Sequence, residues 1–390
     1  MSKLAIVTSH PIQYYAPWFS YISQNTDINL KVFYLWNFGV EEMVDCDFKQ
    51  SIKWDIPLLD GYDYEFIPNV SKNPGTRNIS GLKNPSLLSK VAEYQPDAVM
   101  QIGYNYASLY RFILQWNTKK SPLIFRGDSN CLQSRQGWQE SLKRKFISLI
   151  YSRFAAFLYV GKANYEYFIY HGVKPRQLFF APHAIDNQRF LLAADTAKVE
   201  AIKWKKELGI PDSHRVILFA GKFNQKKRPV DLLQAYKQAE LKDVSLLFVG
   251  SGELEAELKK QAANCPHVFF APFQNQQMMP RTYAIADLFI LPSYGRSETW
   301  GLAINEAMCL SCPIIVSSHV GCGQDLVCQH QNGLIFEAGN VADLTKSIKL
   351  VFSDRERLKQ WGNKSREIIQ NYSYKQTTEG LQKALSSISN

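Results

Sequence analysis

The sequence predicts an α/β fold made of two doubly wound, parallel-sheet domains of the Rossmann-like type. Short, continuous apolar runs alternate with segments of helical spacing along the whole chain, a pattern typical of parallel strands that are covered on both faces. The alternation occurs twice, and 390 residues exceed what one ordinary core accommodates. We therefore expect residues 1–190 and 191–371 to form one domain each.

The apolar runs that we expect to be strands end at Gly, Ser, Pro or His, and segments such as 85–95 and 162–172 between them carry helical spacing. In the first half the expected strands are residues 3–9, 28–36, 97–103, 122–127, 156–161 and 178–183. In the second half they are residues 215–221, 244–250, 267–273, 286–293 and 312–318. The polar stretch 193–215 separates the halves, and residues 372–390 form an amphipathic helix that can pack back on either domain.

Charge and composition limit the function classes. The formal net charge is +10, which favours phosphate-bearing ligands, an anionic membrane surface or nucleic acid. Nucleic acid is the least favoured of these, because the basic residues are scattered and no known binding module is present. The seven cysteines show no framework spacing, and no stretch has the length of a secretory or membrane-spanning segment. We expect a cytoplasmic protein that at most lies on the inner face of a membrane.

Two glutamates follow the expected strand 286–293. In "RSETWGLAINEAM" (residues 296–308), Glu298 precedes a helix that should begin at Leu302, and Glu306 lies inside that helix. A carboxylate can accept hydrogen bonds from two vicinal hydroxyls, and the free N–H groups of a helix start favour an anion. The plainer alternative is that Glu298 caps the helix and Glu306 lies on its solvated face.

A basic loop follows another expected strand. The strand 215–221 ends at Gly221, and the loop 222–228 contains Lys222 and Lys227 before a helix that should start near Pro229. Lysines in this position can neutralise a diphosphate without a metal ion. A solvated basic loop without a ligand is the alternative.

Together these stretches resemble the retaining glycosyltransferases of family 4. The segments that carry the resemblance are residues 179–190, 221–229, 286–293, 298–306 and 320–336. The resemblance covers most of the chain and is strongest from Leu178 to Phe336. It implies the GT-B fold, in which two Rossmann-like domains face an interdomain cleft. The second domain would bind a nucleotide-sugar donor and the first the acceptor.

The resemblance also implies roles for individual residues. Glu306 would hold the ribose of the donor, and Glu298 would contact a hydroxyl of the transferred sugar. Lys222 and Lys227 would bind the diphosphate, although relatives usually have Arg at the first position, so that a bidentate contact is lost. The other donor-binding residues would be Gly221, Phe273 beside the nucleobase, Trp300, and the amides of Gly301 and Leu302.

Three residues of the first half complete the expected site. His10 follows the first strand and is a candidate catalytic contact, with a purely structural histidine as the alternative. Arg126 and Asp128 stand where relatives often have a histidine close to the sugar. Arg126 would bind a phosphate of the donor or a carboxylate of the acceptor, and Asp128 would accept a sugar hydroxyl. A structural Arg–Asp ion pair is the alternative.

The expected activity is transfer of a hexosyl group from a UDP- or GDP-sugar to a glycan, lipid-linked or small-molecule acceptor with retention of configuration. No metal is expected, because lysines replace it and neither "CLSC" (309–312) nor "DCD" (45–47) has the context of a metal site. A sugar-nucleotide epimerase and a catalytically silent nucleotide-sugar binder are the rivals. Residues 135–154 form a basic amphipathic helix that favours an anionic membrane, with an ordinary outer helix as the alternative.

Overall fold

The computed structural model describes residues 2–40, 43–45, 50–133, 137–296 and 298–388. The chain divides into two compact units. Unit 1 comprises Met1–Met43, Ile52–His183 and Tyr374–Asn390, and unit 2 comprises Val44–Ser51 and Ala184–Ser373. Apart from the short segment Val44–Ser51, the chain leaves unit 1 after His183 and re-enters it at Tyr374. A boundary at residue 190 would cut the first turn of the helix Asn187–Glu207, near the start of the longer segment of unit 2.

Unit 1 is built on one sheet in which, within the described residues, seven strands run parallel in the order β5-β2-β1-β6-β7-β8-β9. The strands are β1 (Lys3–Thr8), β2 (Asn29–Tyr34), β5 (Asp63–Phe66), β6 (Ala98–Ile102), β7 (Leu123–Arg126), β8 (Ala156–Tyr159) and β9 (Leu178–Phe180). The order reverses between β1 and β6, which is the signature of a doubly wound sheet.

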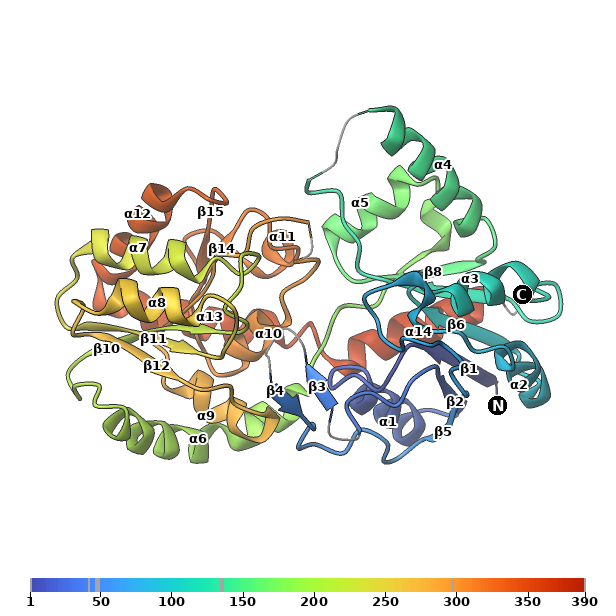
Figure 1. Ribbon diagram of the computed structural model, residues 1–390, viewed down its shortest axis with the longest axis horizontal. Coiled ribbons are helices and arrows are strands. Elements are labelled where there is room, and N and C mark those ends of the chain that lie inside the picture. The colour runs from blue at the N-terminus through green and yellow to red at the C-terminus, as the bar shows by residue number, and fades with distance from the viewer. Residues whose placement is uncertain (1, 41–42, 46–49, 134–136, 297, 389–390) are drawn as a thin grey trace. The chain divides into compact units, whose positions relative to one another are not determined.

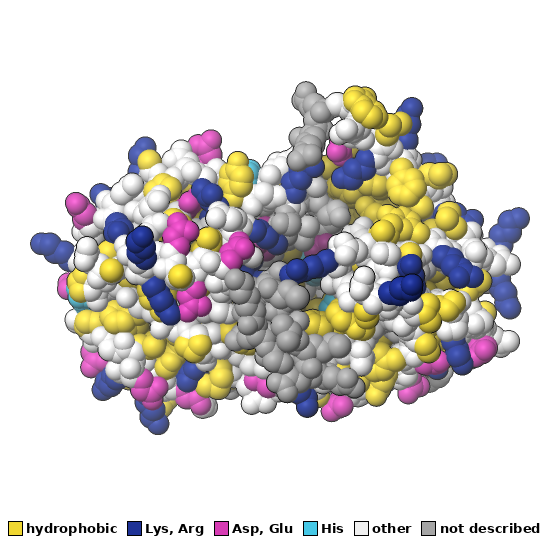
Figure 2. All heavy atoms as spheres, viewed as in Figure 1, with side chains coloured by type: hydrophobic (Ala, Val, Ile, Leu, Met, Phe, Trp, Pro, Cys, Tyr) yellow, Lys and Arg dark blue, Asp and Glu magenta, His cyan; other side chains and the backbone are white. Residues whose placement is uncertain are grey.

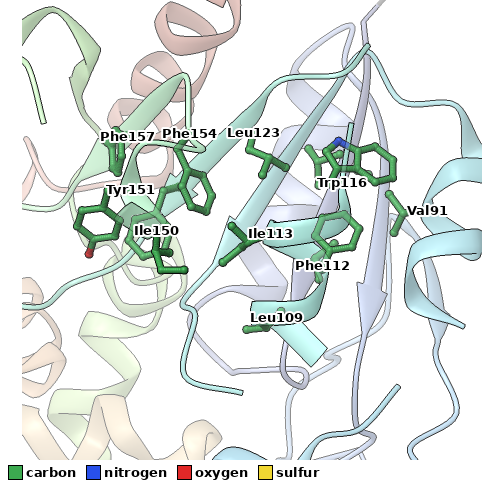
Figure 3. Close-up of a cluster of buried hydrophobic side chains, with 14 of the residues drawn as sticks. Val91, Leu109, Phe112, Ile113, Trp116, Leu123, Ile150, Tyr151, Phe154 and Phe157 are labelled. Atoms are coloured by element: carbon green, nitrogen blue, oxygen red, sulfur yellow. The ribbon is translucent and has the colours of Figure 1, made fainter. Parts of the chain in front are cut away.

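The helices of unit 1 cover this sheet in two groups (Figure 1). They are α1 (Ala16–Asn25), α2 (Leu87–Tyr94), α3 (Ala107–Gln115), α4 (Trp138–Tyr151), α5 (Lys162–Tyr170) and α14 (Tyr374–Ile388), with short 3-10 turns η1 (Ile79–Gly81) and η2 (Pro175–Gln177). Buried residues of α2 to α5 form one core with the strands, and Figure 3 shows part of it around Phe112, Tyr151 and Phe157. Helices α1 and α14 pack against each other, away from this core.

The last helix, α14, is an integral part of unit 1. It packs against β8 and β9, and the indole Nε1 of Trp18 in α1 donates to Thr378 Oγ1 over 3.0 Å. Leu381 is fully buried. A Cβ on Gly380 would lie 2.1 Å from the carbonyl oxygen of Phe180, so this helix approaches β9 at a distance that only glycine permits.

Unit 2 is built on a second parallel sheet, with the order β12-β11-β10-β13-β14-β15 among the described residues. Its strands are β10 (Arg215–Ala220), β11 (Val244–Val249), β12 (Val268–Ala271), β13 (Leu288–Leu291), β14 (Ile314–Ser317) and β15 (Gly333–Phe336). This is the 3-2-1-4-5-6 order of a dinucleotide-binding fold, with its reversal between β10 and β13. Strands β3 (Met43–Asp45) and β4 (Gln50–Ile52) form a separate small sheet.

The unit 2 helices lie on both faces of its sheet (Figure 1). They are α6 (Asn187–Glu207), α7 (Pro229–Ala239), α8 (Glu255–Ala262), α9 (Met279–Ala284), α10 (Leu302–Cys309), α11 (Gly323–Leu326), α12 (Val341–Phe352) and α13 (Arg355–Ile369), with the 3-10 turn η3 (Gln276–Met278). Helices α7, α8 and α12 group together, as do α6, α9 and α10. Over the described part of the chain, no helix is both long and apolar enough to span a bilayer.

The predicted parallel α/β organisation is confirmed, and all eleven expected strands occur. The sequence did not reveal β3, β4, β5 or β15. Strand β5 lies at the edge of its sheet with two exposed residues, Asp63 and Tyr64, so it lacks the continuous apolar run of a central strand. Strand β15 is only four residues long and starts with Gly333.

We predict that Leu381→Ala destabilises unit 1 by about 2–5 kcal/mol, because it opens a cavity under α14. The measurement is urea unfolding combined with amide hydrogen exchange in peptides that cover β8 and β9. The matched control is Gln382→Ala, which changes an exposed neighbour on the same helix and should alter stability by less than about 0.5 kcal/mol. Equal effects of the two variants would show that α14 does not stabilise unit 1.

Candidate functional site

The unit 2 sheet offers a binding position where its strand order reverses. Strand β10 ends at Ala220 and β13 at Leu291, and the two are neighbours. Their helices run to opposite sides of the sheet, so the loops that follow them separate at the carboxyl ends of the strands. The loop after β10 carries Lys222 to Arg228, and the loop after β13 carries Glu298. Parallel pairing alone therefore brings the basic loop and the first glutamate together.

A buried ion pair joins these two loops. Lys227 Nζ lies 2.5 Å from Glu298 Oε2, and the two side chains are 18% and 7% exposed. Ser293, just after β13, donates from Oγ to the same carboxylate oxygen over 2.8 Å. Burial alone would raise the pKa of Glu298, but the charges of Lys227 and Lys226 outweigh it and hold the pKa below its ordinary value. Glu298 is therefore ionised at neutral pH.

The second glutamate is held from another helix. Glu306 in α10 is 2% exposed, and its Oε2 accepts a hydrogen bond of 2.7 Å from the hydroxyl of Tyr283 in α9. Glu306 is therefore not on a solvated face, and the carboxylate of Glu298 is held by Lys227 and Ser293. Tyr283 could not be identified from the sequence, because the contact between α9 and α10 is a tertiary feature.

The turn before α10 depends on Gly301. Its φ is +101°, and an added Cβ would lie 3.0 Å from a methyl of Leu291 and 3.1 Å from one of Val320. A larger residue would be strained by both the backbone and its neighbours. The helix starts at Leu302, as predicted, so the amides of Gly301 and Leu302 lie at its amino end.

The other predicted donor-binding residues of unit 2 have mixed surroundings. Trp300 is buried, and its Nε1 donates to Asn305 Oδ1 over 2.9 Å, which makes it a packing residue of this turn. Gly221 follows β10 directly, and a Cβ on Gly250 would lie 2.0 Å from its carbonyl oxygen, so the two strand ends meet closely. Lys222 and Phe273 are half-buried at the ends of β10 and β12.

Chemically, this arrangement combines cations with fixed acceptors. The loop 222–228 holds three lysines and Arg228; Lys227 pairs with Glu298, and Arg228 pairs with Asp231. Such a loop attracts a polyanion. Two buried carboxylates can accept hydrogen bonds from hydroxyl groups. The site therefore suits a ligand that carries both phosphates and hydroxyls.

Arg126 has a structural position. The side chain is 1% exposed, and its guanidinium donates to the carbonyl oxygens of Ala181 and Pro182 over 2.9 and 3.3 Å. It also lies over the rings of Trp18 and Tyr15, 4.8 and 5.6 Å from their centroids. Arg126 ties β7 to the segment after β9. A ligand-binding role for it stays a prediction that this burial does not favour.

Asp128 lies beside a residue that the sequence analysis did not single out. Its Oδ2 is 3.5 Å from Nε2 of His183, while its side chain is 40% exposed. Burial lowers the pKa of His183 below its ordinary value, although Asp128 opposes the shift. The one signal in the sequence was that His183 ends the expected strand 178–183. Asp128 and His183 form a polar pair at the carboxyl ends of the unit 1 strands.

His10 is half-buried among aromatic rings. Its ring centroid lies 6.1 Å from that of Trp36 and 5.5 Å from that of Phe38, and Nδ1 is 3.0 Å from Ser9 Oγ. Burial lowers the pKa of His10 to about 4. The imidazole is therefore neutral near pH 7 and able to act as a hydrogen-bonding partner.

Metal ligands do not gather in the described ranges (2–40, 43–45, 50–133, 137–296 and 298–388), where no group of three or more His, Cys, Asp or Glu could hold a metal ion. Cys309 and Cys312 are buried, and burial raises the pKa of both thiols. Of the "DCD" segment, Cys46 and Asp47 lie outside the described residues.

Comparison with known proteins finds similarity mainly in unit 2. Residues 200–368 match the family model described as "Glycosyl transferases group 1". The sulfoquinovosyl transferase SQD2 of Arabidopsis thaliana is 28% identical over 166 residues, which are 42% of this chain and 31% of that protein. A D-inositol 3-phosphate glycosyltransferase of Nocardia farcinica is 28% identical over 189 residues, 45% of this chain and 41% of that protein. The chain spans less than half the length of these two relatives.

Solved structures resemble the chain over nearly its whole length. Anabaena Alr3699/HepE in complex with UDP and glucose gives a TM-score of 0.74 at 16% identity, covering 99% of this chain and all of that chain. A glycosyltransferase from Rickettsia africae ESF-5 gives 0.76 at 14% identity, covering 99% of this chain and 98% of that chain. The predicted GT-B fold, with two Rossmann-like domains, is confirmed.

We predict that Tyr283→Phe destabilises unit 2 by about 1.5–3 kcal/mol, the scale for a hydrogen bond to a charged group. The buried Glu306 carboxylate would lose a donor that water cannot replace. Tyr236→Phe is the matched control, since Tyr236 donates to the neutral carbonyl of Val244 over a similar 2.7 Å. The measurement is the free energy of unfolding in urea for both variants. A decrease for Tyr283→Phe no larger than that for Tyr236→Phe would contradict a stabilising hydrogen bond from Tyr283 to Glu306.

We predict that His10→Gln reduces the acid sensitivity of unit 1. Between the ordinary histidine pKa of 6.5 and the folded value of about 4, the unfolded chain binds a proton at His10 that the folded chain does not. The free energy of unfolding therefore decreases as the pH is lowered through this window, by at most about 1.4 kcal/mol per pH unit. Urea unfolding at pH 7, 6 and 5 should show a shallower loss in the variant. A control, His330→Asn, removes an exposed histidine; if it flattens the profile equally, the assignment to His10 fails.

Proposed function

We propose that this protein is a retaining glycosyltransferase of family 4 that transfers a hexosyl group from a UDP- or GDP-sugar. The observation that carries the proposal is the Lys227–Glu298 pair at the β10–β13 reversal, inside the segment that matches the group 1 glycosyltransferases. The neighbour Alr3699/HepE was solved with UDP-glucose, and the relatives named above are sugar transferases, which supports a nucleotide-sugar donor.

In this proposal the diphosphate of the donor replaces Glu298 as the ion-pair partner of Lys227. A diphosphate carries more charge than one carboxylate, so Lys227 would turn towards it, with Lys222 as a second cation. Glu298 would then accept a hydrogen bond from a hydroxyl of the transferred sugar, while Ser293 keeps the carboxylate in place. The ion pair would thus hold both groups ready while no donor is bound.

The other end of the donor would lie on α10. Glu306, fixed by Tyr283, would accept both ribose hydroxyls, and the amides of Gly301 and Leu302 would donate to the sugar or the β-phosphate. Phe273 would lie beside the nucleobase. Gly221 would let the backbone approach the phosphates, and Trp300 would support the turn from behind rather than touch the donor.

The acceptor is proposed to bind to unit 1, at the carboxyl ends of its strands. Asp128 is the exposed member of the pair with His183 and would accept a hydroxyl of the acceptor or the sugar. His10, neutral at pH 7, would be a second polar contact. A glycan, a lipid-linked sugar or a small sugar-like molecule would satisfy these groups.

The reaction would take place on one face of the sugar. The bond between the anomeric carbon and the phosphate oxygen breaks, the acceptor oxygen bonds to the same face, and the leaving diphosphate takes the acceptor's proton. Lys222 and Lys227 would stabilise the negative charge that develops on the leaving group. In this scheme the lysines neutralise that charge without a metal, so EDTA should leave the rate unchanged.

We predict that Glu306→Gln weakens donor binding by about 1.5–3 kcal/mol, because the ribose hydroxyls lose a charged acceptor. Titration calorimetry with UDP- and GDP-sugars measures this. The matched control is Glu337→Gln, an exposed glutamate of the same unit, which should bind the donor as the wild type does. Wild-type affinity in the Glu306 variant would mean that the ribose binds elsewhere.

Activity assays distinguish the proposal from its rivals. Consumption of the donor only when an acceptor is present supports a transferase, and NMR of the product's anomeric proton should show retained configuration. A new nucleotide-sugar formed without acceptor would indicate an epimerase. Saturable donor binding without turnover over a broad acceptor panel would indicate a silent binder.

A further inference from the structure

Helix α4 has an apolar side that the described chain leaves largely exposed. Trp138, Leu142, Phe146 and Leu149, which we call the α4 stripe, are 71%, 56%, 50% and 66% exposed. They recur every three or four residues, so they share one side of the helix. A second set, Ile147, Ile150 and Tyr151, is buried in the core of unit 1. An ordinary outer helix has one apolar side, but α4 has two.

The apolar surface continues onto the neighbouring helix α3. The ring of Phe146 contacts that of Tyr110, with centroids 5.8 Å apart, and Leu114, one turn further along α3, is 60% exposed. Figure 2 shows hydrophobic side chains gathered over the part of unit 1 where α4 and α3 lie. Single exposed apolar side chains are common, but a contiguous group of this kind marks a surface that binds something.

Two lysines flank the α4 stripe, one on each side. Lys143, Arg144 and Lys145 lie within it in sequence, and all three are exposed. Arg144 projects from the other side of the helix, where its Nε donates to the carbonyl of Tyr170 over 2.8 Å. Lys143 has one weak acidic contact, with Glu140 at 3.9 Å. The surface is therefore apolar in its centre and positive at its margin. Arg135 of the predicted membrane segment lies outside the described residues.

We propose that the α4 stripe inserts into the interfacial region of an anionic lipid bilayer, with Lys143 and Lys145 on the lipid headgroups. Trp and Leu side chains suit the boundary between headgroups and acyl chains, and each lysine is attracted by anionic lipid. The inference concerns unit 1 alone and does not depend on the proposed transfer reaction.

Charge favours a lipid surface over a second copy of the chain. A symmetric dimer through α4 would bring the same lysines of both copies towards each other. The whole chain carries a formal charge of +10, which adds to the repulsion. An anionic bilayer instead accepts the apolar residues and neutralises the cations that border them.

The test is co-sedimentation of the full chain with phosphatidylcholine vesicles that contain or lack phosphatidylglycerol. We expect binding to the anionic vesicles at low salt and its loss at high salt, since screening shortens the Debye length from about 10 Å at 0.1 M to about 3 Å at 1 M. Brominated lipids should quench part of the tryptophan fluorescence, and Trp138→Phe should remove that part.

Two double variants test the two components. Leu142→Gln/Leu149→Gln should lower the partition coefficient about tenfold or more through lost apolar insertion. Lys143→Gln/Lys145→Gln should lower it by a similar factor on anionic vesicles only. The matched controls lie in unit 2: Leu192→Gln/Ile202→Gln on α6 and Lys346→Gln/Lys349→Gln on α12, all exposed. Circular dichroism should show unchanged folding in all four.

Three outcomes would overturn the inference. One is no binding at low salt, or equal binding to neutral and anionic vesicles. The second is an equal loss of binding in the α6 control pair. The third is a dimer, seen by light scattering, that the α4 variant converts to a monomer, which would show that a second copy covers the stripe. Donor titration of the same samples reports separately on the proposed function.

Discussion

Parallel pairing of β10 with β13 is the constraint on which the candidate site depends. It brings together two loops whose paired side chains, Lys227 and Glu298, are 71 positions apart in the chain. Removing both charges from water is costly, and the cost is offset only by close contact and further hydrogen bonds. Ser293 supplies one of these. The pair is poorly suited to a merely stabilising role, which fits a site that exchanges one partner for a ligand.

Much of this arrangement could be predicted because it follows from local patterns in the amino-acid sequence. The strands are short apolar runs, α7 begins at Pro229 and α10 at Leu302 as expected, and the carboxyl ends of the strands locate the lysines and glutamates. What could not be predicted depends on contacts between distant segments. Tyr283 reaches Glu306 only because α9 and α10 pack together.

Arg126 shows why a residue's place along a strand does not determine its environment. It is the last residue of β7, a position where charged side chains often meet ligands. Its side chain instead turns to the carbonyls of Ala181 and Pro182 beneath Trp18. Whether such a side chain meets a ligand or the backbone depends on how α1 and the segment after β9 pack. This packing leaves no signal in the local sequence. The exposure of the α4 stripe is hidden from the sequence for the same reason.

Helix α14 has a consequence for how this protein is made. Unit 2 has its whole sequence once residue 373 has been synthesised, whereas unit 1 lacks the helix that packs on β8 and β9. Domains generally fold as units while the chain leaves the ribosome. Unit 1 is therefore begun first and completed last. During translation the surface of β8 and β9 stays uncovered until Leu381 and its neighbours in α14 have been synthesised. A nascent chain stalled between residues 373 and 381 would present that apolar surface to chaperones.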